Sequence, residues 1–118
     1  MHYDDMTRFI AAGVKYVREE ALIEAGSAST PDVVFLDTVF INGARVHWID
    51  SKCYYGSAGS KMFTQKLKKQ IERYDTAFNG RGAIIYKFGF SVPLMETLPQ
   101  TLLLDSGPLP IHEEEEIL

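Results

Sequence analysis

Two β-rich segments joined by Asn42-Gly43 constrain this chain more than any other feature of its sequence. Residues 32–41 and 44–53 are rich in β-branched and aromatic side chains, which is the composition of β-strands. Asn-Gly is a preferred dipeptide of two-residue hairpin turns, because both turn positions need a positive φ. The sequence therefore predicts an antiparallel hairpin near the middle of the chain.

Local patterns predict the elements around this hairpin. Residues 7–25 are expected to form a helix, interrupted near Gly13 and stopped by Gly26. A second helix is expected over residues 61–78, where apolar side chains recur every three or four residues. These side chains are Phe63, Leu67, Ile71, Tyr74 and Phe78. Residues 83–90 and 101–105 are predicted strands, with a proline-bounded loop between them. The expected fold class is α/β (α+β).

Length and composition indicate one intracellular domain. With 118 residues, of which 46% are hydrophobic, the chain can bury a real core; we expect the domain to span residues 1–112, with an acidic tail over 113–118. No apolar run approaches the roughly 20 residues that cross a bilayer, and no signal peptide is apparent. The single cysteine fits a reducing compartment, nuclear in a eukaryote and otherwise cytoplasmic. We expect Cys53 to be a small buried residue.

Charge is distributed unevenly along the chain. The formal net charge is −4, yet residues 61–87 hold seven basic side chains against two acidic ones. The basic side chains of the predicted second helix are candidates for contacts with DNA phosphates, which position a duplex without reading its sequence. They are Lys61, Lys66, Lys68, Lys69 and Arg73. The alternative is a solvated helix face.

The residues with the clearest chemical meaning lie at one end of the hairpin. Asp32 opens the first strand, and Asp50-Ser51-Lys52 closes the second. Residues two apart in a strand share a face, so Asp50 and Lys52 point the same way. Mg²⁺ or Mn²⁺ could bind to Asp32, Asp50 and the Ser51 carbonyl, because hard cations prefer oxygen ligands. Lys52 would orient the attacking water or stabilise the transition state. An Asp-x-Lys sequence alone is more often a surface ion pair, and its combination with Asp32 favours a phosphodiester-cleaving site.

The same residues resemble the PD-(D/E)xK nucleases and, more narrowly, their TPD-motif family, which includes Codanin-1-interacting nucleases. The matching segments are Thr30-Pro31-Asp32, Trp48-Ile49-Asp50-Ser51-Lys52, Tyr55-Gly56, Ile85-Tyr86 and Gly89-Phe90. The resemblance covers about residues 13–110. It implies a restriction-endonuclease-like core with a mixed β-sheet flanked by helices, Mg²⁺-dependent cleavage of DNA and, in a eukaryote, a Codanin-1-like partner. The family's N-terminal helical region has no match, so we expect a minimal or shortened member.

Three further site residues follow from the resemblance. Nucleases of this superfamily often carry a glutamate on the first helix as an additional metal or water ligand, and Glu19 is preferred over Glu20. Gln70 and Tyr74 match the Q-x-x-x-Y pattern of the RecB-like branch and share a helix face. Gln70 could meet a phosphate or the catalytic water with support from Tyr74. The alternatives are a solvated face for Glu19 and core packing for Tyr74.

Other residues and functions remain open. Trp48 and His47 are expected to pack or cap rather than to stack on bases. The preferred function is a metal-dependent deoxyribonuclease, with a homodimer also allowed. The alternatives are a non-catalytic nuclease-fold module that serves as a protein-interaction platform, and an RNA-directed nuclease.

The hairpin register makes the metal site testable. In a regular two-residue turn, paired residue numbers sum to 85 and Asp32 faces away from Asp50, because a slip of one residue exchanges the two faces of a strand. The proposed chemistry therefore requires an even sum at the Asp32 end. A three-residue loop over 41–43 with a bulge at Gly43 is the preferred solution and would place Asp32 opposite Lys52. A bulge elsewhere in either strand, or a loop over 42–44, would serve equally well.

Overall fold

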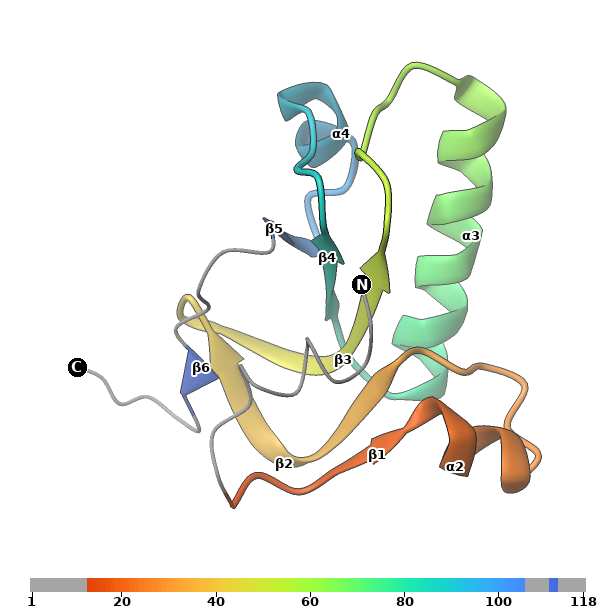
Figure 1. Ribbon diagram of the computed structural model, residues 1–118, viewed down its shortest axis with the longest axis vertical. Helices are drawn as coiled ribbons and strands as arrows, with labels where there is room; N and C mark the ends of the chain where they lie inside the picture. Colours follow the sequence, from red (N-terminus) through yellow and green to blue (C-terminus); the bar gives the residue numbers. More distant parts are fainter. Residues whose placement is uncertain (1–12, 106–110, 113–118) are drawn as a thin grey trace.

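The computed structural model describes residues 13–105 and 111–112. Its strands form one curved mixed sheet (Figure 1). The strands are β1 Tyr16–Arg18, β2 Val33–Ile41, β3 Ala44–Lys52, β4 Gly82–Tyr86, β5 Leu102–Asp105 and β6 Ile111–His112. The helices are α2 Glu19–Glu24, α3 Lys61–Ala77 and α4 Val92–Thr97. The strand order is β1-β2-β3-β4-β5, with β6 paired to β2. The predicted α+β class with a mixed sheet is confirmed.

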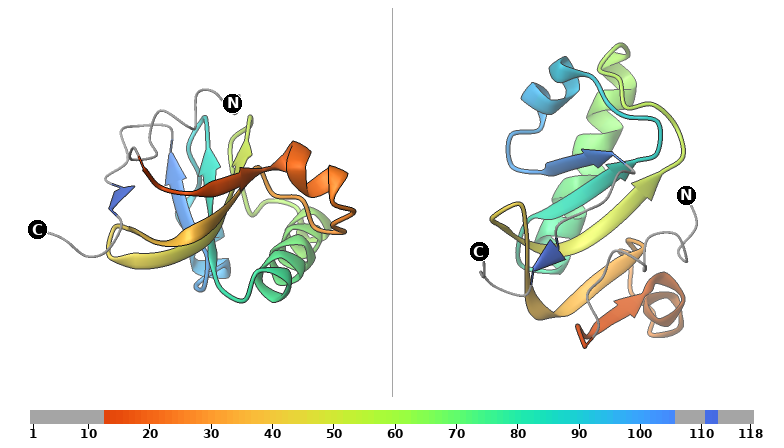
Figure 2. Two further views of the ribbon diagram at one scale, coloured as in Figure 1. Left: turned by 90° about the horizontal axis from the view of Figure 1, so that it is seen from below. Right: turned by 60° about the vertical axis from the view of Figure 1, so that its left-hand side comes forward.

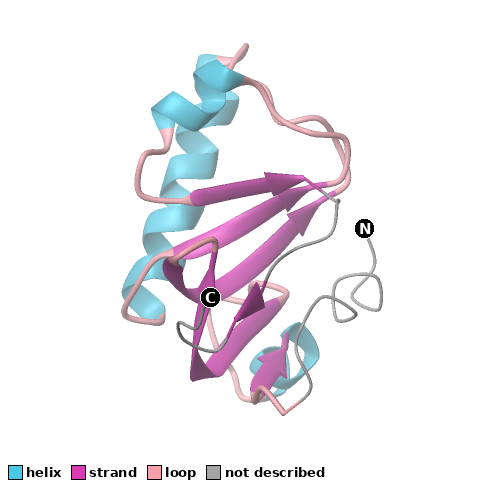
Figure 3. Ribbon diagram, turned by 90° about the vertical axis from the view of Figure 1, so that its left-hand side faces the viewer, coloured by secondary structure: helices cyan, strands magenta, loops and turns pink. Residues whose placement is uncertain are grey.

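The sheet is antiparallel on one side of β3 and parallel on the other. Strands β1, β2 and β3 pair antiparallel, whereas β3, β4 and β5 pair parallel. The parallel connection from β3 to β4 passes through α3, which lies along one face of the sheet (Figures 2 and 3). None of the helices in the described ranges is long and apolar enough to cross a membrane.

The turn of the hairpin contains two residues. Ile41 pairs directly with Ala44, and Asn42 and Gly43 have φ angles of 51° and 80°. Two successive positive φ angles are typical of a type I′ turn. The hairpin and its Asn-Gly turn are therefore confirmed, and the three-residue loop that we preferred is wrong.

An irregularity within β2, rather than the turn, makes the sum of paired residue numbers even at the Asp32 end of the hairpin. Val39 pairs with Val46, but Val34 pairs with Trp48, so that four residues of β2 stand opposite one residue of β3. Paired numbers sum to 85 beside the turn and to 82 beyond the irregularity. The parity that the chemistry requires is thus present, and the register continues with Asp32 opposite Asp50 rather than opposite Lys52.

Lys15, which directly precedes strand β1, bonds to the irregular segment. The Leu36 and Asp37 N–H groups donate to the Lys15 carbonyl at 2.9 and 3.4 Å, and the Lys15 N–H donates to the Asp37 carboxylate at 2.8 Å. Strand β2 bends at this point (Figure 1). These bonds connect the surface bend to the residue that precedes β1 and stabilise the change of register.

Two apolar clusters show that the side chains of β3 exchange faces of the sheet opposite the irregularity in β2. Val33, Phe35, Val39 and Ile41 of β2 belong to one cluster throughout. In β3, Val46 belongs to that cluster, whereas Trp48 belongs to the cluster that packs against α3. Residues two apart normally share a face, so the alternation of β3 slips between Val46 and Trp48. As a result Trp48, and after it Asp50 and Lys52, lie on the α3 face.

The N-terminal helix that we predicted is largely wrong within the described residues. Residues 16–18 form strand β1, and the helix is confined to Glu19–Glu24; residues 7–12 lie outside the described ranges, as does the predicted tail over 113–118. The alternating segment at 16–18 pairs with β2. Pairing with the bent strand therefore overrides the local helical pattern.

The C-terminal half follows the sequence more closely. The helix predicted over 61–78 and the strand over 101–105 are confirmed as α3 and β5. The strand predicted over 83–90 ends at Tyr86, where a turn leads to Gly89 with φ of 84°. The proline-bounded loop contains α4, which the sequence analysis missed although Ser91 caps its Leu94 N–H and a proline stands in its first turn. Strand β6 was not predicted.

Trp48 joins the sheet to α3. Its side chain is fully buried, its indole N–H donates to Asp75 of α3 at 3.1 Å, and its ring meets Tyr74 edge-on at 5.0 Å. The expectation that Trp48 packs is confirmed. Gly82 stands opposite Trp48 on β4, and a Cβ atom at Gly82 would clash with the indole ring of Trp48. Only glycine leaves room for the indole here.

We expect Gly82→Ala to destabilise the fold by at least about 2 kcal/mol, because the added methyl group overpacks the buried indole. Urea unfolding followed by tryptophan fluorescence measures this loss. Gly59→Ala is the matched control, since its nearest contact would be the Ser57 hydroxyl at 3.3 Å. Equal stability of the two variants would contradict this role of Gly82.

Candidate functional site

The three residues of the predicted catalytic motif meet at the end of the hairpin. Asp50 is buried, with 8% of its surface exposed, and its carboxylate accepts from the Lys52 ammonium at 2.9 Å. The Asp32 carboxylate accepts from the Ser51 N–H and from the Ser51 hydroxyl, each at 2.8 Å. Asp32 is therefore fixed to the strand that carries Asp50 and Lys52.

The electrostatics of Asp50 reflect a crowded and buried site. Burial, followed by the charge of Asp32 and a hydrogen bond with Asp32, raises the pKa of Asp50, which comes to about 6 when all effects are combined. Lys52 acts in the opposite direction through its charge and its hydrogen bond. Two carboxylates thus lie near one another while the ammonium group of Lys52 pairs with Asp50, and a bound cation would relieve the remaining repulsion between them.

A chain of hydrogen bonds connects Lys52 to α3. The Lys52 ammonium donates to the Gln70 carbonyl at 2.9 Å, and the Gln70 amide donates to the Tyr74 hydroxyl at 3.2 Å. Burial and the charges of Asp50 and Asp32 raise the pKa of Tyr74 above its usual value, so its hydroxyl remains protonated. Tyr74 thus bonds to Gln70 and is also a core residue, and the part of Gln70 and Tyr74 in a reaction stays a prediction.

Glu19 lies next to Asp32 at the start of α2. Its backbone N–H donates to the Asp32 carbonyl at 3.1 Å. Partial burial raises the pKa of Glu19, and the neighbouring charge of Asp32 raises it as well. Glu20 instead forms an exposed ion pair with Arg18 at 3.1 Å. Of the two glutamates, the preferred Glu19 is the one whose pKa is raised by the charge of Asp32.

The donor set fits a hard cation only if other oxygen atoms complete it. Within residues 13–105 and 111–112, no group of three or more His, Cys, Asp or Glu side chains is placed to hold a metal ion. Asp32 and Asp50 nevertheless form a carboxylate pair, and Mg²⁺ commonly binds through one or two carboxylates with water in the other positions. The Ser51 carbonyl and Glu19 as further ligands remain predictions.

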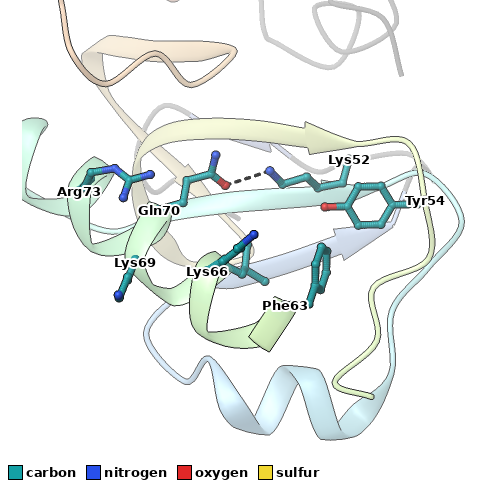
Figure 4. A pocket seen from close by; sticks show the side chains of 8 residues that line it. Lys52, Tyr54, Phe63, Lys66, Lys69, Gln70 and Arg73 are labelled. Carbon is teal, nitrogen blue, oxygen red and sulfur yellow. Dashed lines mark hydrogen bonds between the residues drawn. The ribbon is translucent and has the colours of Figure 1, made fainter. Parts of the chain in front are cut away.

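A pocket of about 380 Å³ opens beside Lys52 along α3 (Figure 4). The residues that line it are Lys52, Tyr54, Phe63, Lys66, Leu67, Lys69, Gln70 and Arg73. Three of the five cations predicted to contact DNA belong to this set, namely Lys66, Lys69 and Arg73. Their spacing of three and four residues places them on one helix face. Lys61 and Lys68 do not line the pocket.

The sequence analysis missed the two aromatic residues of this pocket. Phe63 was assigned to the apolar stripe of the helix, yet 41% of its surface is exposed, and Tyr54, also 41% exposed, was given no role. Cys53 is exposed as well, so the expectation that it is buried is wrong, because β3 ends at Lys52. His47 packs on Gly80 and lies 3.3 Å from the Arg81 carbonyl, as expected.

Several known proteins are similar to this chain in sequence. Residues 5–106 match the model of a family described as a protein of unknown function with a TPD sequence motif. The chain is 32% identical over 94 residues to "CDAN1-interacting nuclease 1" of Danio rerio, covering 80% of this chain and 30% of that protein. It is 33% identical over 92 residues to the Xenopus tropicalis protein of that name, covering 78% and 29%, and 32% identical over 77 residues to the Homo sapiens one, covering 65% and 26%.

The chain therefore spans less than a third of the length of these relatives. No solved structure matches it significantly.

We expect Asp50→Asn to be more stable than the parent above pH 6. The pKa of Asp50 is raised to about 6 in the folded state, so its contribution to stability is complete below about pH 4 and is lost as the pH rises through 6. The difference amounts to at most about 3 kcal/mol. Urea unfolding of both proteins across this pH range measures it. A variant less stable than the parent at every pH would show that Asp50 is retained for folding.

Proposed function

The chain belongs to the TPD sequence-motif family, and we propose that it is a metal-dependent nuclease that hydrolyses phosphodiester bonds of DNA. The observation that carries this proposal is the approach of Asp32 to Asp50 and Lys52 on the α3 face. A regular hairpin would separate these side chains, whereas the bend of β2 brings them together. The names of the relatives, which include the word nuclease, support the same activity.

The proposed cofactor is Mg²⁺ or Mn²⁺. Asp32 and Asp50 would hold it, with the Ser51 carbonyl and Glu19 as further candidates. When bound, such a cation lowers the pKa of coordinated water and offsets charge on the phosphate. Above pH 6 the Asp50 carboxyl is predominantly ionised even without a cation, because its pKa is about 6.

Lys52 is the proposed group that meets the reacting phosphate. An ammonium group has three N–H donors, and two of them are directed to Asp50 and Gln70. The third can donate to a phosphate oxygen or to the attacking water. Gln70 and Tyr74 hold Lys52 in place through their hydrogen bonds, so we assign them a positioning role. Preorganised donors of this kind stabilise a transition state without further rearrangement.

Lys66, Lys69 and Arg73 supply the proposed contacts with the DNA backbone. They line the pocket that begins at Lys52, so phosphates bound there would lie next to the carboxylates. Contacts of this type add affinity without sequence specificity.

A protein-interaction platform is the second candidate function. The relatives are named for an interaction with CDAN1, and this chain exposes large apolar side chains, among them Phe88, Val92 and Met95. A Codanin-1-like protein is the proposed partner in that case. Such a role would not require the Asp32, Asp50 and Lys52 side chains.

We expect the parent to cleave labelled DNA with Mg²⁺ or Mn²⁺ and not with EDTA. Asp50→Asn and Lys52→Gln should each reduce the rate by at least about a hundredfold, because each removes a group that acts on the reacting phosphate or its cation. Glu20→Gln is the matched control, since Glu20 lies in an exposed ion pair with Arg18. RNA of the same sequence completes the panel. Cleavage by both site variants at the parental rate would refute the proposed site.

We expect DNA affinity to depend steeply on salt through the pocket cations. Replacing Lys66, Lys69 and Arg73 together by glutamine should lower the slope of log affinity against log salt by up to about three units, roughly one for each lost phosphate contact. The control replaces Lys61 and Lys68, which are exposed on the same helix outside the pocket, and should change the slope by less than about one unit. Equal slopes for both variants would place the DNA elsewhere.

A further inference from the structure

We propose that the pocket beside Lys52 receives an unpaired nucleotide of the DNA, with its base against Tyr54 and Phe63 and its phosphates near Lys66 and Arg73. This inference rests on the proposed function and adds the substrate class. The substrate is DNA with a single-stranded segment next to the cleaved bond.

The aromatic end of the pocket is a preorganised surface formed by two rings. Tyr54 and Phe63 meet edge-on, with their ring centroids 5.8 Å apart and an interplanar angle of 66°. Both residues have 41% of their surface exposed. Tyr54 also contacts the fully buried ring of Tyr86 at 6.0 Å, and Tyr86 contacts Phe90 at 6.2 Å. The exposed rings are therefore supported by buried ones.

Backbone hydrogen bonds fix the loop that carries Tyr54. The Gly56 N–H donates to the Gly89 carbonyl at 2.9 Å, and the Gly56 carbonyl accepts from the Ser91 N–H at 2.8 Å. A Cβ atom at Gly56 would lie 2.9 Å from the Tyr86 ring, so this loop approaches the aromatic cluster as closely as glycine allows. A fixed ring loses little conformational entropy when a ligand stacks on it.

The charge of the pocket is complementary to a nucleotide. Its lining contains Lys52, Lys66, Lys69 and Arg73 and no carboxylate. Tyr54 and Phe63 lie at one end and Arg73 at the other, with Lys66 between them (Figure 4). The volume of about 380 Å³ lies within the usual range for pockets that hold small organic ligands. A planar base joined to a phosphate satisfies both ends.

An unpaired base is required because a duplex hides the surface that the rings would contact. Within a duplex the base faces are covered by their neighbours, and the grooves offer only base edges. Aromatic side chains bind bases of single strands by stacking on those faces. Lys52 lines the pocket and pairs with Asp50 at 2.9 Å. A nucleotide in the pocket would therefore place its phosphate close to the carboxylates.

The test compares the binding of three labelled DNAs in EDTA by fluorescence anisotropy. One is a blunt duplex, one carries a short unpaired tail, and one carries the same tail without bases. We expect the parent to bind the tailed duplex about tenfold more tightly than the blunt one, which corresponds to the stacking of one base. The tail without bases keeps its phosphates and should lose most of this gain.

Variants then assign the gain to the two rings. Tyr54→Leu and Phe63→Leu should each lose most of the preference for the tailed duplex, whereas Tyr54→Phe should keep it. Tyr55→Leu is the matched control, because Tyr55 is exposed beside Tyr54 but does not line the pocket. Thermal melting checks that the variants are folded. The tail without bases needs no variant and therefore tests the inference even if one of them unfolds.

The outcomes separate this inference from the proposed function. A parent that cleaves DNA with metal but binds blunt and tailed duplexes equally overturns the inference alone. Full binding of the tail without bases, or an unchanged preference in folded Tyr54→Leu and Phe63→Leu, does the same. A parent that cleaves no DNA with any cation overturns the proposed function, whatever its binding preference.

Discussion

The bend of β2 determines which face of the sheet carries the polar site. Four residues of β2 lie opposite one residue of β3. The Lys15 carbonyl accepts from the Leu36 and Asp37 N–H groups, and the Lys15 N–H donates to the Asp37 carboxylate, so these bonds hold the excess length in place. In a hairpin of constant register, Asp32 would face away from Asp50, because the side chains of a strand alternate strictly between its two faces. The position of the carboxylates thus depends on backbone bonds made some distance away, at β1.

The slip in the side-chain alternation of β3 between Val46 and Trp48 also sets the position of α3. It turns Trp48 toward the helix, where the indole N–H bonds to Asp75 and the ring packs on Tyr74. A buried tryptophan contributes a large apolar area with one polar atom that needs a partner, so it fixes both the distance and the rotation of the helix. That rotation brings Gln70 to Lys52. The core contact and the polar contact are therefore consequences of one packing arrangement.

The sequence was sufficient wherever local chemistry decides the outcome. Asn42-Gly43 specifies its own turn, the apolar spacing of residues 61–78 specifies α3, and the motif around Asp50 specifies which residues to examine. The location of the irregularity in β2 could not be predicted, because it depends on β1. The local sequence of residues 16–18 favours a helix, so β1 itself was not predicted. Likewise Phe63 looks like a core residue in the helical stripe, and only the tertiary arrangement shows that α3 extends past the sheet there and leaves the ring exposed.

The second carboxylate is the feature that a simple structural ion pair would not need. Asp50 and Lys52 form a buried pair at 2.9 Å, and such a pair can serve folding by fixing a register. One carboxylate would be enough for that purpose. Asp32 adds a negative charge that raises the pKa of the buried Asp50, which makes the folded state less favourable above pH 6. Folding gains nothing from this repulsion, because the Ser51 N–H and hydroxyl that bond to Asp32 could be satisfied by a neutral acceptor. An arrangement that costs stability and concentrates like charges beside a cationic pocket supports the proposal of a ligand that needs both carboxylates.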